Sequence, residues 1–146
     1  MQNSPPANSK RSWQNDLTLD WSPKSITRGK DAVLSLHISI PQGLHIQASK
    51  PSEEFFIPTE VRLDKTEGLE IGNPGYPDPV TLSAAWSEVK LLVYENTITV
   101  AIPLRVLPTA SPGKRRISGT LRYQGCTHSA CLPPKTQSFI IDLNLF

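Results

Sequence analysis

The residues best suited to chemistry are the cysteines Cys126 and Cys131, the only two in a chain of 146 residues. Four residues separate them, so a disulfide between them would close a very short loop. In the chain-entropy model such a crosslink stabilises a fold by roughly 2 kcal/mol, against about 4.7 kcal/mol for a loop of about 100 residues. The spacing therefore favours a disulfide that opens and closes. The main alternative is a structural disulfide in an exported domain.

Two other kinds of site receive little support from the sequence. A metal site would have to combine both cysteines with His128 and His45, and the Cys-x-His-x2-Cys spacing matches no standard zinc site. Nucleophilic hydrolysis would need a base with an orienting partner, and His37 lies at an outward-facing strand position without one. The sequence has no phosphate-binding glycine loop and no His-Glu metal helix. We therefore expect neither a metal ion nor another bound cofactor.

The composition is that of one globular domain with many turns. Hydrophobic residues make up 38% of the chain, and no apolar run approaches the roughly 18 residues of a membrane span. A net charge of +2 gives no basis for nucleic-acid binding, and the one basic cluster, 114–116, reads as a solvated turn. Fourteen prolines and eight glycines indicate many turns and few helices.

Apolar and polar residues alternate along several segments, which is the period of a half-buried β-strand. The longest such segments are 33–40, 97–106, 117–123 and 139–145. Shorter candidates are Leu17 to Trp21, Leu44 to Gln47, Thr59 to Leu63 and Lys90 to Tyr94. Strands with one apolar face predict an all-β fold, an immunoglobulin-like antiparallel β-sandwich in a single domain.

The segments between and beyond the predicted strands indicate the limits of the domain. Residues 67–79, with three glycines and three prolines, are predicted to form a long irregular connection. Residues 1–12 are predicted to be a flexible N-terminal tether, and residues 13–146 to form the domain. The chain ends on a strand pattern, so we expect a domain excised from a longer protein.

The cysteines are predicted to face each other across a hairpin. One strand should end near Gly125 and the next should begin at Lys135, so that the cysteines flank a tight connection. Opposed residues of antiparallel strands have Cα atoms about 4.5 to 5.5 Å apart, the short side of the range for disulfides. Strain of that kind makes a disulfide easier to exchange. The charge of His128, between the cysteines, could favour a thiolate, although such a residue is more often simply solvated.

Two segments resemble a known family, the N-terminal periplasmic domain of the thiol:disulfide interchange protein DsbD. In that family, Tyr-Gln-x-Cys and Cys-x-Pro-Pro-x-Thr segments bracket the redox loop, as 123–126 and 131–136 do here. A second similar piece is 43–46 followed by 51–59. A known member has one more residue between its cysteines, and the aromatic residue that often follows the second cysteine is replaced by Leu132.

The resemblance implies an immunoglobulin-like domain in the bacterial periplasm, tethered to the inner membrane through its parent protein and itself outside the membrane. Its cysteine pair would relay electrons from a thioredoxin-like domain of the parent to thioredoxin-fold partners, such as a disulfide isomerase or a cytochrome c maturation thioredoxin. The domain would thus be part of a protein-disulfide reductase. By analogy Cys131 forms the bond to the partner and Cys126 resolves it.

In the family, a cap loop with acidic and aromatic residues shields the cysteines. The matching residues here are Glu53, Glu54, Phe55 and Phe56, with Tyr123 as a further modulator. An aromatic ring over the disulfide would exclude stray thiols, and nearby carboxylates would raise the pKa of a thiol. The competing hypothesis is a non-enzymatic immunoglobulin-like binding or structural module with a hairpin disulfide. Under it, the two phenylalanines are ordinary core residues.

Overall fold

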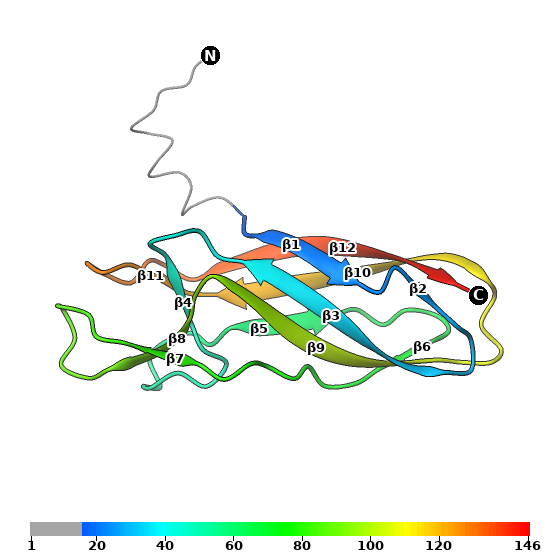
Figure 1. The fold of residues 1–146 in the computed structure, drawn as a ribbon, viewed down its shortest axis with the longest axis horizontal. Helices are drawn as coiled ribbons and strands as arrows, with labels where there is room; N and C mark the ends of the chain where they lie inside the picture. The colour runs from blue at the N-terminus through cyan, green and yellow to red at the C-terminus, as the bar shows by residue number, and fades with distance from the viewer. Residues whose placement is uncertain (1–15) are drawn as a thin grey trace, which may run out of the picture.

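The computed structural model describes residues 16–146, and within that range the chain forms twelve β-strands and no helix (Figure 1). In chain order the strands are β1 Thr18–Ser22, β2 Ser25–Ile26, β3 Asp31–Ser39, β4 His45–Gln47, β5 Glu60–Leu63, β6 Leu69–Ile71, β7 Val80–Leu82, β8 Leu91–Tyr94, β9 Thr97–Val106, β10 Gly113–Tyr123, β11 Gly125–Cys126 and β12 Lys135–Leu145. The all-β prediction is confirmed.

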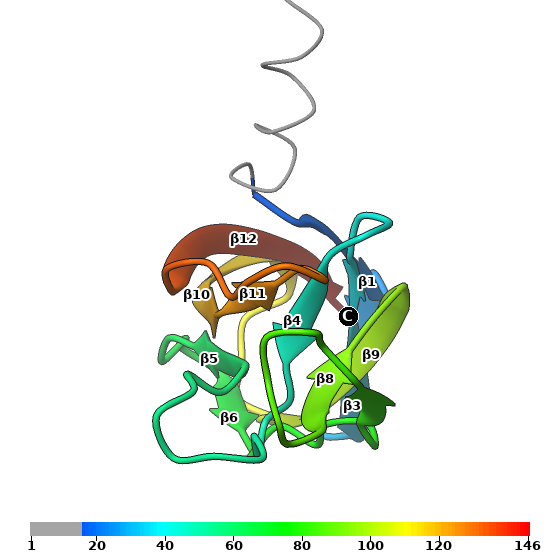
Figure 2. The same cartoon turned by 90° about the vertical axis from the view of Figure 1, so that its left-hand side faces the viewer.

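The strands form three sheets of four strands each. The strand orders are β1-β3-β9-β6 in the first sheet, β2-β12-β10-β5 in the second and β11-β4-β8-β7 in the third. Neighbouring strands are antiparallel except β2 and β12, which are parallel. The first two sheets form the body of the sandwich, and the third closes one of its ends (Figures 1 and 2).

The core forms because the alternation of the sequence matches the alternation of a strand. In β9 every second residue from Ile98 to Val106 is buried, and β12 repeats the pattern at Ile141 and Leu143. These side chains join Leu36 and others of β3 in one continuous hydrophobic cluster between the first two sheets. Burial of this apolar surface is the main source of stability.

The second sheet is built on a long hairpin. Strands β10 and β12 pair over 11 residues, from Gly113 opposite Leu145 to Tyr123 opposite Lys135. At Gly119 an added Cβ would lie 2.6 Å from the ring of Phe139 and 2.7 Å from a β5 carbonyl oxygen. Only glycine therefore permits this close approach of three strands. The hairpin carries the cysteines at its far end.

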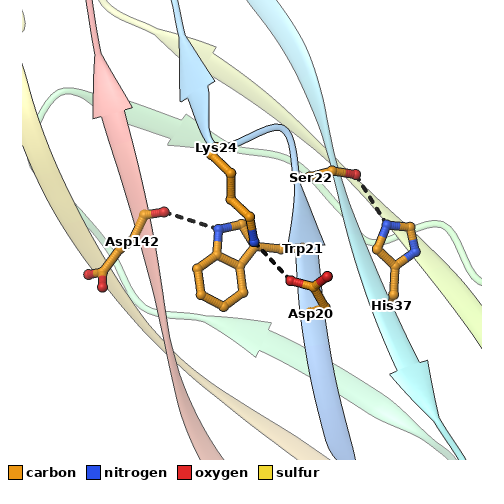
Figure 3. Close-up of polar contacts among 6 residues, drawn as sticks. All are labelled: Asp20, Trp21, Ser22, Lys24, His37 and Asp142. Carbon is orange, nitrogen blue, oxygen red and sulfur yellow. Dashed lines mark hydrogen bonds and ion pairs between the residues drawn. The ribbon is translucent and has the colours of Figure 1, made fainter.

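Trp21 ties the edge strand β1 of the first sheet to the second sheet (Figure 3). Its indole N–H donates to the carbonyl oxygen of Asp142 on β12 at 3.0 Å. The Lys24 ammonium lies 3.8 Å from the centre of the ring and bonds the Asp20 carboxylate at 2.8 Å. The cation and the indole attract each other, which favours this placement of the edge strand.

His37 lies on the outer face of the first sheet (Figure 3). Its Nε2 is 3.1 Å from the hydroxyl of Ser22 on β1, and its Nδ1 is 3.0 Å from the hydroxyl of Thr99 on β9. The imidazole therefore links three adjacent strands across their exposed surface.

The structure contains all eight strands expected from the alternation. Six of them agree within two residues at each end, whereas β10 and β12 each begin four residues before the alternating segments 117–123 and 139–145. The structure also contains four that the sequence did not indicate, β2, β6, β7 and β11, each of two or three residues. Residues 67–79 are not wholly irregular, because β6 lies within them and pairs with β9. The predicted tether, residues 1–12, lies outside the described residues, and the boundary at residue 13 stays a prediction.

Candidate redox site

Cys126 and Cys131 form a disulfide at the tip of the hairpin that continues β10 and β12. On either side of the pair, the N–H of Thr127 donates to the carbonyl of Ala130, and that of Leu132 to the carbonyl of Gly125, both at 2.7 Å. The cysteines therefore occupy a non-hydrogen-bonded pair, in which opposed Cα atoms are closest. Their Cα atoms are 3.9 Å apart, closer than the expected 4.5 to 5.5 Å.

Thr127 shapes the turn between the cysteines. Its hydroxyl accepts the backbone N–H groups of Ser129 and Ala130 at 3.2 Å and donates to the carbonyl of Ala130 at 3.1 Å. Such local bonds from a hydroxyl to the backbone stabilise a tight turn. His128 is exposed at the tip of this turn.

The two sulfur-bearing residues differ in exposure. Cys126 is fully buried, and its backbone pairs with His45 of β4. Cys131 is half-buried and packs against a small hydrophobic cluster of Phe56, Ala84, Leu91 and Val93. A thiol from another molecule can therefore approach Cys131 more readily than Cys126.

Residues 49–58, between β4 and β5, are here called the cap loop, and its Phe56 packs on the Leu91 and Val93 side chains of β8 in the third sheet. Within the cap loop, Phe56 is 6% exposed and belongs to the cluster on which Cys131 packs, whereas Phe55 is 74% exposed. The two rings lie 4.6 Å apart, and the Phe56 ring also meets Trp86 edge-on at 6.4 Å. The structure thus places Phe56 beside the disulfide and leaves Phe55 in solvent.

Gln124 joins the cap loop to the cysteine hairpin. Its side-chain oxygen accepts the backbone N–H of Ile57 at 2.9 Å, and its amide donates to the carbonyl of Leu132 at 3.2 Å. The cap loop is also closed at its base, where the N–H of Thr59 donates to the carbonyl of Ala48 at 3.3 Å. Hydrogen bonds at Ile57 and Thr59 therefore hold the C-terminal end of the loop, and the loop itself contains no β-strand.

Two side chains of β4 lie on the same face of the sheet as Cys126. The amide of Gln47, fully buried, donates to the sulfur of Cys126 at 3.2 Å and lies 3.8 Å from that of Cys131. His45 bonds Glu95 through its Nε2 at 3.0 Å, and its Nδ1 is buried without a hydrogen-bond partner. The disulfide thus lies between an apolar cap and a polar strand.

The other predicted site residues have different surroundings. Tyr123 belongs to the main core, where its hydroxyl is buried without a partner. Burial raises the pKa of this phenol, with a smaller contribution from the carboxylate of Asp16. Glu53 and Glu54 lie on the cap loop, half-buried and exposed, and the carbonyl of Glu53 accepts the N–H of Phe56. Their effect on a thiol pKa stays a prediction.

Sequence reasoning gave no role to Gln47 or Trp86, and it included Gln124 only as part of the motif 123–126. Gln47 follows His45 by two residues on β4, so the two side chains lie on the same face of the strand. That spacing was the one available indication that Gln47 lies near the site. Trp86 lies in the turn between β7 and β8, and β7 was itself not predicted.

Within residues 16–146, no three metal-binding side chains cluster together. The same residues include no helix that is long and apolar enough to cross a membrane.

An all-β sandwich with a partly accessible disulfide at a hairpin tip, beside an aromatic cap, defines a class of thiol–disulfide exchange domain. The family model described as "Thiol:disulfide interchange protein DsbD, N-terminal" matches residues 17–143, and the chain belongs to this family. Family membership and the Cys126–Cys131 disulfide together support thiol–disulfide exchange.

Solved structures share the fold. The reduced DsbD N-terminal domain of Neisseria meningitidis is 19% identical with a TM-score of 0.55, and the match covers 97% of this chain and 90% of that one. The N-terminal periplasmic domain of ScsB from Proteus mirabilis is 15% identical with a TM-score of 0.51, covering 81% of this chain and 43% of that one. Among curated proteins, none matches the sequence significantly. The immunoglobulin-like fold class is confirmed.

Proposed function

We propose that this chain is a periplasmic domain that relays electrons through the Cys126–Cys131 disulfide. It accepts them from a thioredoxin-like domain of its parent protein, which tethers it to the inner membrane. It passes them to thioredoxin-fold partners such as a disulfide isomerase or a cytochrome c maturation thioredoxin. Family membership and the periplasmic origin of the similar ScsB domain support this proposal.

The difference in exposure between the two cysteines carries the proposal. Exchange requires a partner sulfur to approach one sulfur in line with the disulfide while the other leaves. Cys131 is the half-buried residue and Cys126 is fully buried, so Cys131 forms the mixed disulfide and Cys126 is the resolving cysteine.

The cap loop controls access to this reaction. Phe56 packs in the cluster that contacts Cys131, and it limits the approach of small thiols and oxidants. A folded partner displaces the loop through its own surface and thereby gains access to the sulfur. Phe55, Glu53 and Glu54 lie on the same loop and meet the partner first.

A trapping experiment tests the assignment of the two cysteines. The probe is a purified disulfide isomerase whose second active-site cysteine is replaced by serine and whose remaining catalytic cysteine carries thionitrobenzoate, a coloured leaving group. The Cys126→Ser variant, with Cys131 free, is expected to release the colour and to form a persistent mixed disulfide. The matched Cys131→Ser variant is expected to react far more slowly. Equal reaction of both variants, or of neither, would overturn the assignment.

The reduction potential decides between the relay and the competing structural module, in which the disulfide only fastens a hairpin. A potential well above about −300 mV, measured in dithiothreitol or glutathione buffers, is expected for an exchangeable disulfide. A value well below it identifies a structural disulfide and contradicts the relay.

A further inference from the structure

Gln47 is a fully buried polar side chain that faces both sulfurs. Its Nε2 donates to the sulfur of Cys126 at 3.2 Å and lies 3.8 Å from that of Cys131. Its Oε1 is also buried and has no hydrogen-bond partner. A buried acceptor without a partner costs free energy, so an apolar side chain would suit the oxidised domain better.

The backbone of Gln47 is fixed on all sides. Its N–H donates to the carbonyl of Gln124 at 3.0 Å, and its own carbonyl accepts the hydroxyl of Thr59. Opposite it on β8 lies Val93, a member of the cluster on which Cys131 packs. In such dry surroundings a hydrogen bond from an amide to a charged sulfur is stronger than in water.

We propose that Gln47 is a catalytic residue of the exchange reaction, whose side-chain amide stabilises the Cys126 thiolate while the disulfide is open. This inference rests on the proposed function. A partner thiolate attacks the sulfur of Cys131, and the bond between Cys131 and Cys126 breaks. Its electron pair leaves on the sulfur of Cys126. The partner sulfur is oxidised to the mixed disulfide, and Cys126 is reduced to a thiolate. This thiolate accepts a hydrogen bond from the side-chain N–H of Gln47.

The same amide favours the fully reduced domain. When the second thiol of the partner resolves the mixed disulfide, the partner leaves as a disulfide and Cys131 is released as a thiolate that takes up a proton. Once Cys126 is also protonated, its S–H can donate to the free Oε1 of Gln47. The amide then has hydrogen-bond partners that the disulfide does not provide, so Gln47 shifts the equilibrium toward the dithiol.

The test replaces Gln47 by methionine, which keeps the length of the side chain and removes its hydrogen bonds. We expect reduction by dithiothreitol at neutral pH to slow by about tenfold, because a hydrogen bond to a charged group is worth that order. We expect the dithiol-to-disulfide equilibrium to move about fivefold toward the disulfide, which is about 20 mV.

Gln137→Met is the matched control. Gln137 is also a buried amide, and it bonds the backbone N–H and carbonyl of Leu17 at 2.8 Å instead of a sulfur. Its variant is expected to lose stability and to keep the wild-type rate and potential. If Gln47→Met reacts and equilibrates like the wild type, or if Gln137→Met shows the same shifts, the proposal is wrong.

A second measurement needs no variant. In the wild-type domain the side-chain ¹⁵N–H resonances of Gln47 should move on reduction by dithiothreitol, and those of Gln137 should not. Unmoved Gln47 resonances contradict the inference even where the Met variant fails to fold. The absolute potential tests the relay, whereas the difference between variant and wild type tests Gln47, so either idea can fail alone.

Discussion

The body of the sandwich and the end that carries the disulfide are built in different ways. In the body, β3 pairs with β9 over nine residues and β10 with β12 over eleven, around a core of aliphatic side chains. At the redox end, β11 pairs with β4 over two residues, and so does β4 with β8. The strands of the third sheet are short and are connected there to the long loops β4–β5 and β7–β8 (Figure 2).

The buried residues of the two regions differ as well. The body buries mainly Leu, Ile and Val, while the redox end adds to its buried Leu91, Val93 and Phe56 two groups that contact each other, the amide of Gln47 and the sulfur of Cys126. Local opening costs least where few backbone bonds and few apolar contacts hold a segment. The body therefore supplies most of the stability, as the proposed opening of the cap loop requires.

Substitution in the body should give the largest loss of stability. Ile141 is fully buried between the sheets, so Ile141→Ala is expected to lower the free energy of unfolding by about 2 to 5 kcal/mol. The reduction potential of the disulfide should stay at the wild-type value. Guanidinium unfolding of the oxidised protein and redox titration measure the two quantities. A shifted potential would show that the two regions are coupled.

Substitution of the buried cap residue should affect the disulfide more than the fold. Phe56→Ala is expected to cost about 2 to 3 kcal/mol, at or below the low end for a buried aromatic residue, because the loop can collapse. Dithiothreitol should reduce the disulfide roughly tenfold faster, which corresponds to a barrier lowered by about 1.4 kcal/mol. Stopped-flow or alkylation kinetics give the rate. An unchanged rate would mean that Phe56 is only a core residue.

The body was the part that the sequence predicted best. In β9 and β12, alternation over ten or more residues leaves only one register that buries the apolar side chains. The missed strands, such as β6 and β11, have two or three residues, which is too short for a period to be visible. Their pairing is decided by the neighbouring strands and not by their own sequence.

The site was predicted from its motif and only partly from physical chemistry. The cysteine spacing indicated the disulfide, and the family resemblance supplied the cap. Which phenylalanine is buried depends on the direction of the loop after a turn, in which the N–H of Phe56 donates to the carbonyl of Glu53. The sequence alone does not give that direction. Gln47 could not be assigned to the sulfurs, because only the pairing of β4 with β11 brings it near them.

Tyr123 lies where the body meets the redox end, and its ionisation should lower the stability of the fold at alkaline pH. Its folded-state pKa is raised by burial above the ordinary value of about 10, so the unfolded chain ionises first. The stability contribution is complete below about pH 10 and is lost as the pH rises through the folded-state pKa. Tyr123→Phe should remove this part of the alkaline loss without cost at pH 7, since its hydroxyl has no partner.

The control is Tyr76→Phe. The phenol of Tyr76 also has a raised pKa, chiefly through burial, but its oxygen accepts the N–H of Val61 at 2.9 Å. That variant should lose about 1 kcal/mol at pH 7, because the N–H is left without its partner. Urea unfolding at pH 7 and above pH 10 compares the two variants. Equal behaviour at pH 7 would contradict the assignment of a free hydroxyl to Tyr123.

The smallest effect on stability is expected at Phe55, the exposed neighbour of Phe56. Because 74% of Phe55 is accessible, Phe55→Ala should change the free energy of unfolding by no more than about 0.5 kcal/mol. Reduction by dithiothreitol should also be unchanged, whereas exchange with a thioredoxin-fold protein should slow several-fold, since exposed aromatic residues are enriched in protein interfaces. Phe146→Ala, 65% exposed at the opposite end, should leave both rates unchanged. Equal slowing by both variants would mean that the partner does not distinguish the cap loop from the rest of the surface.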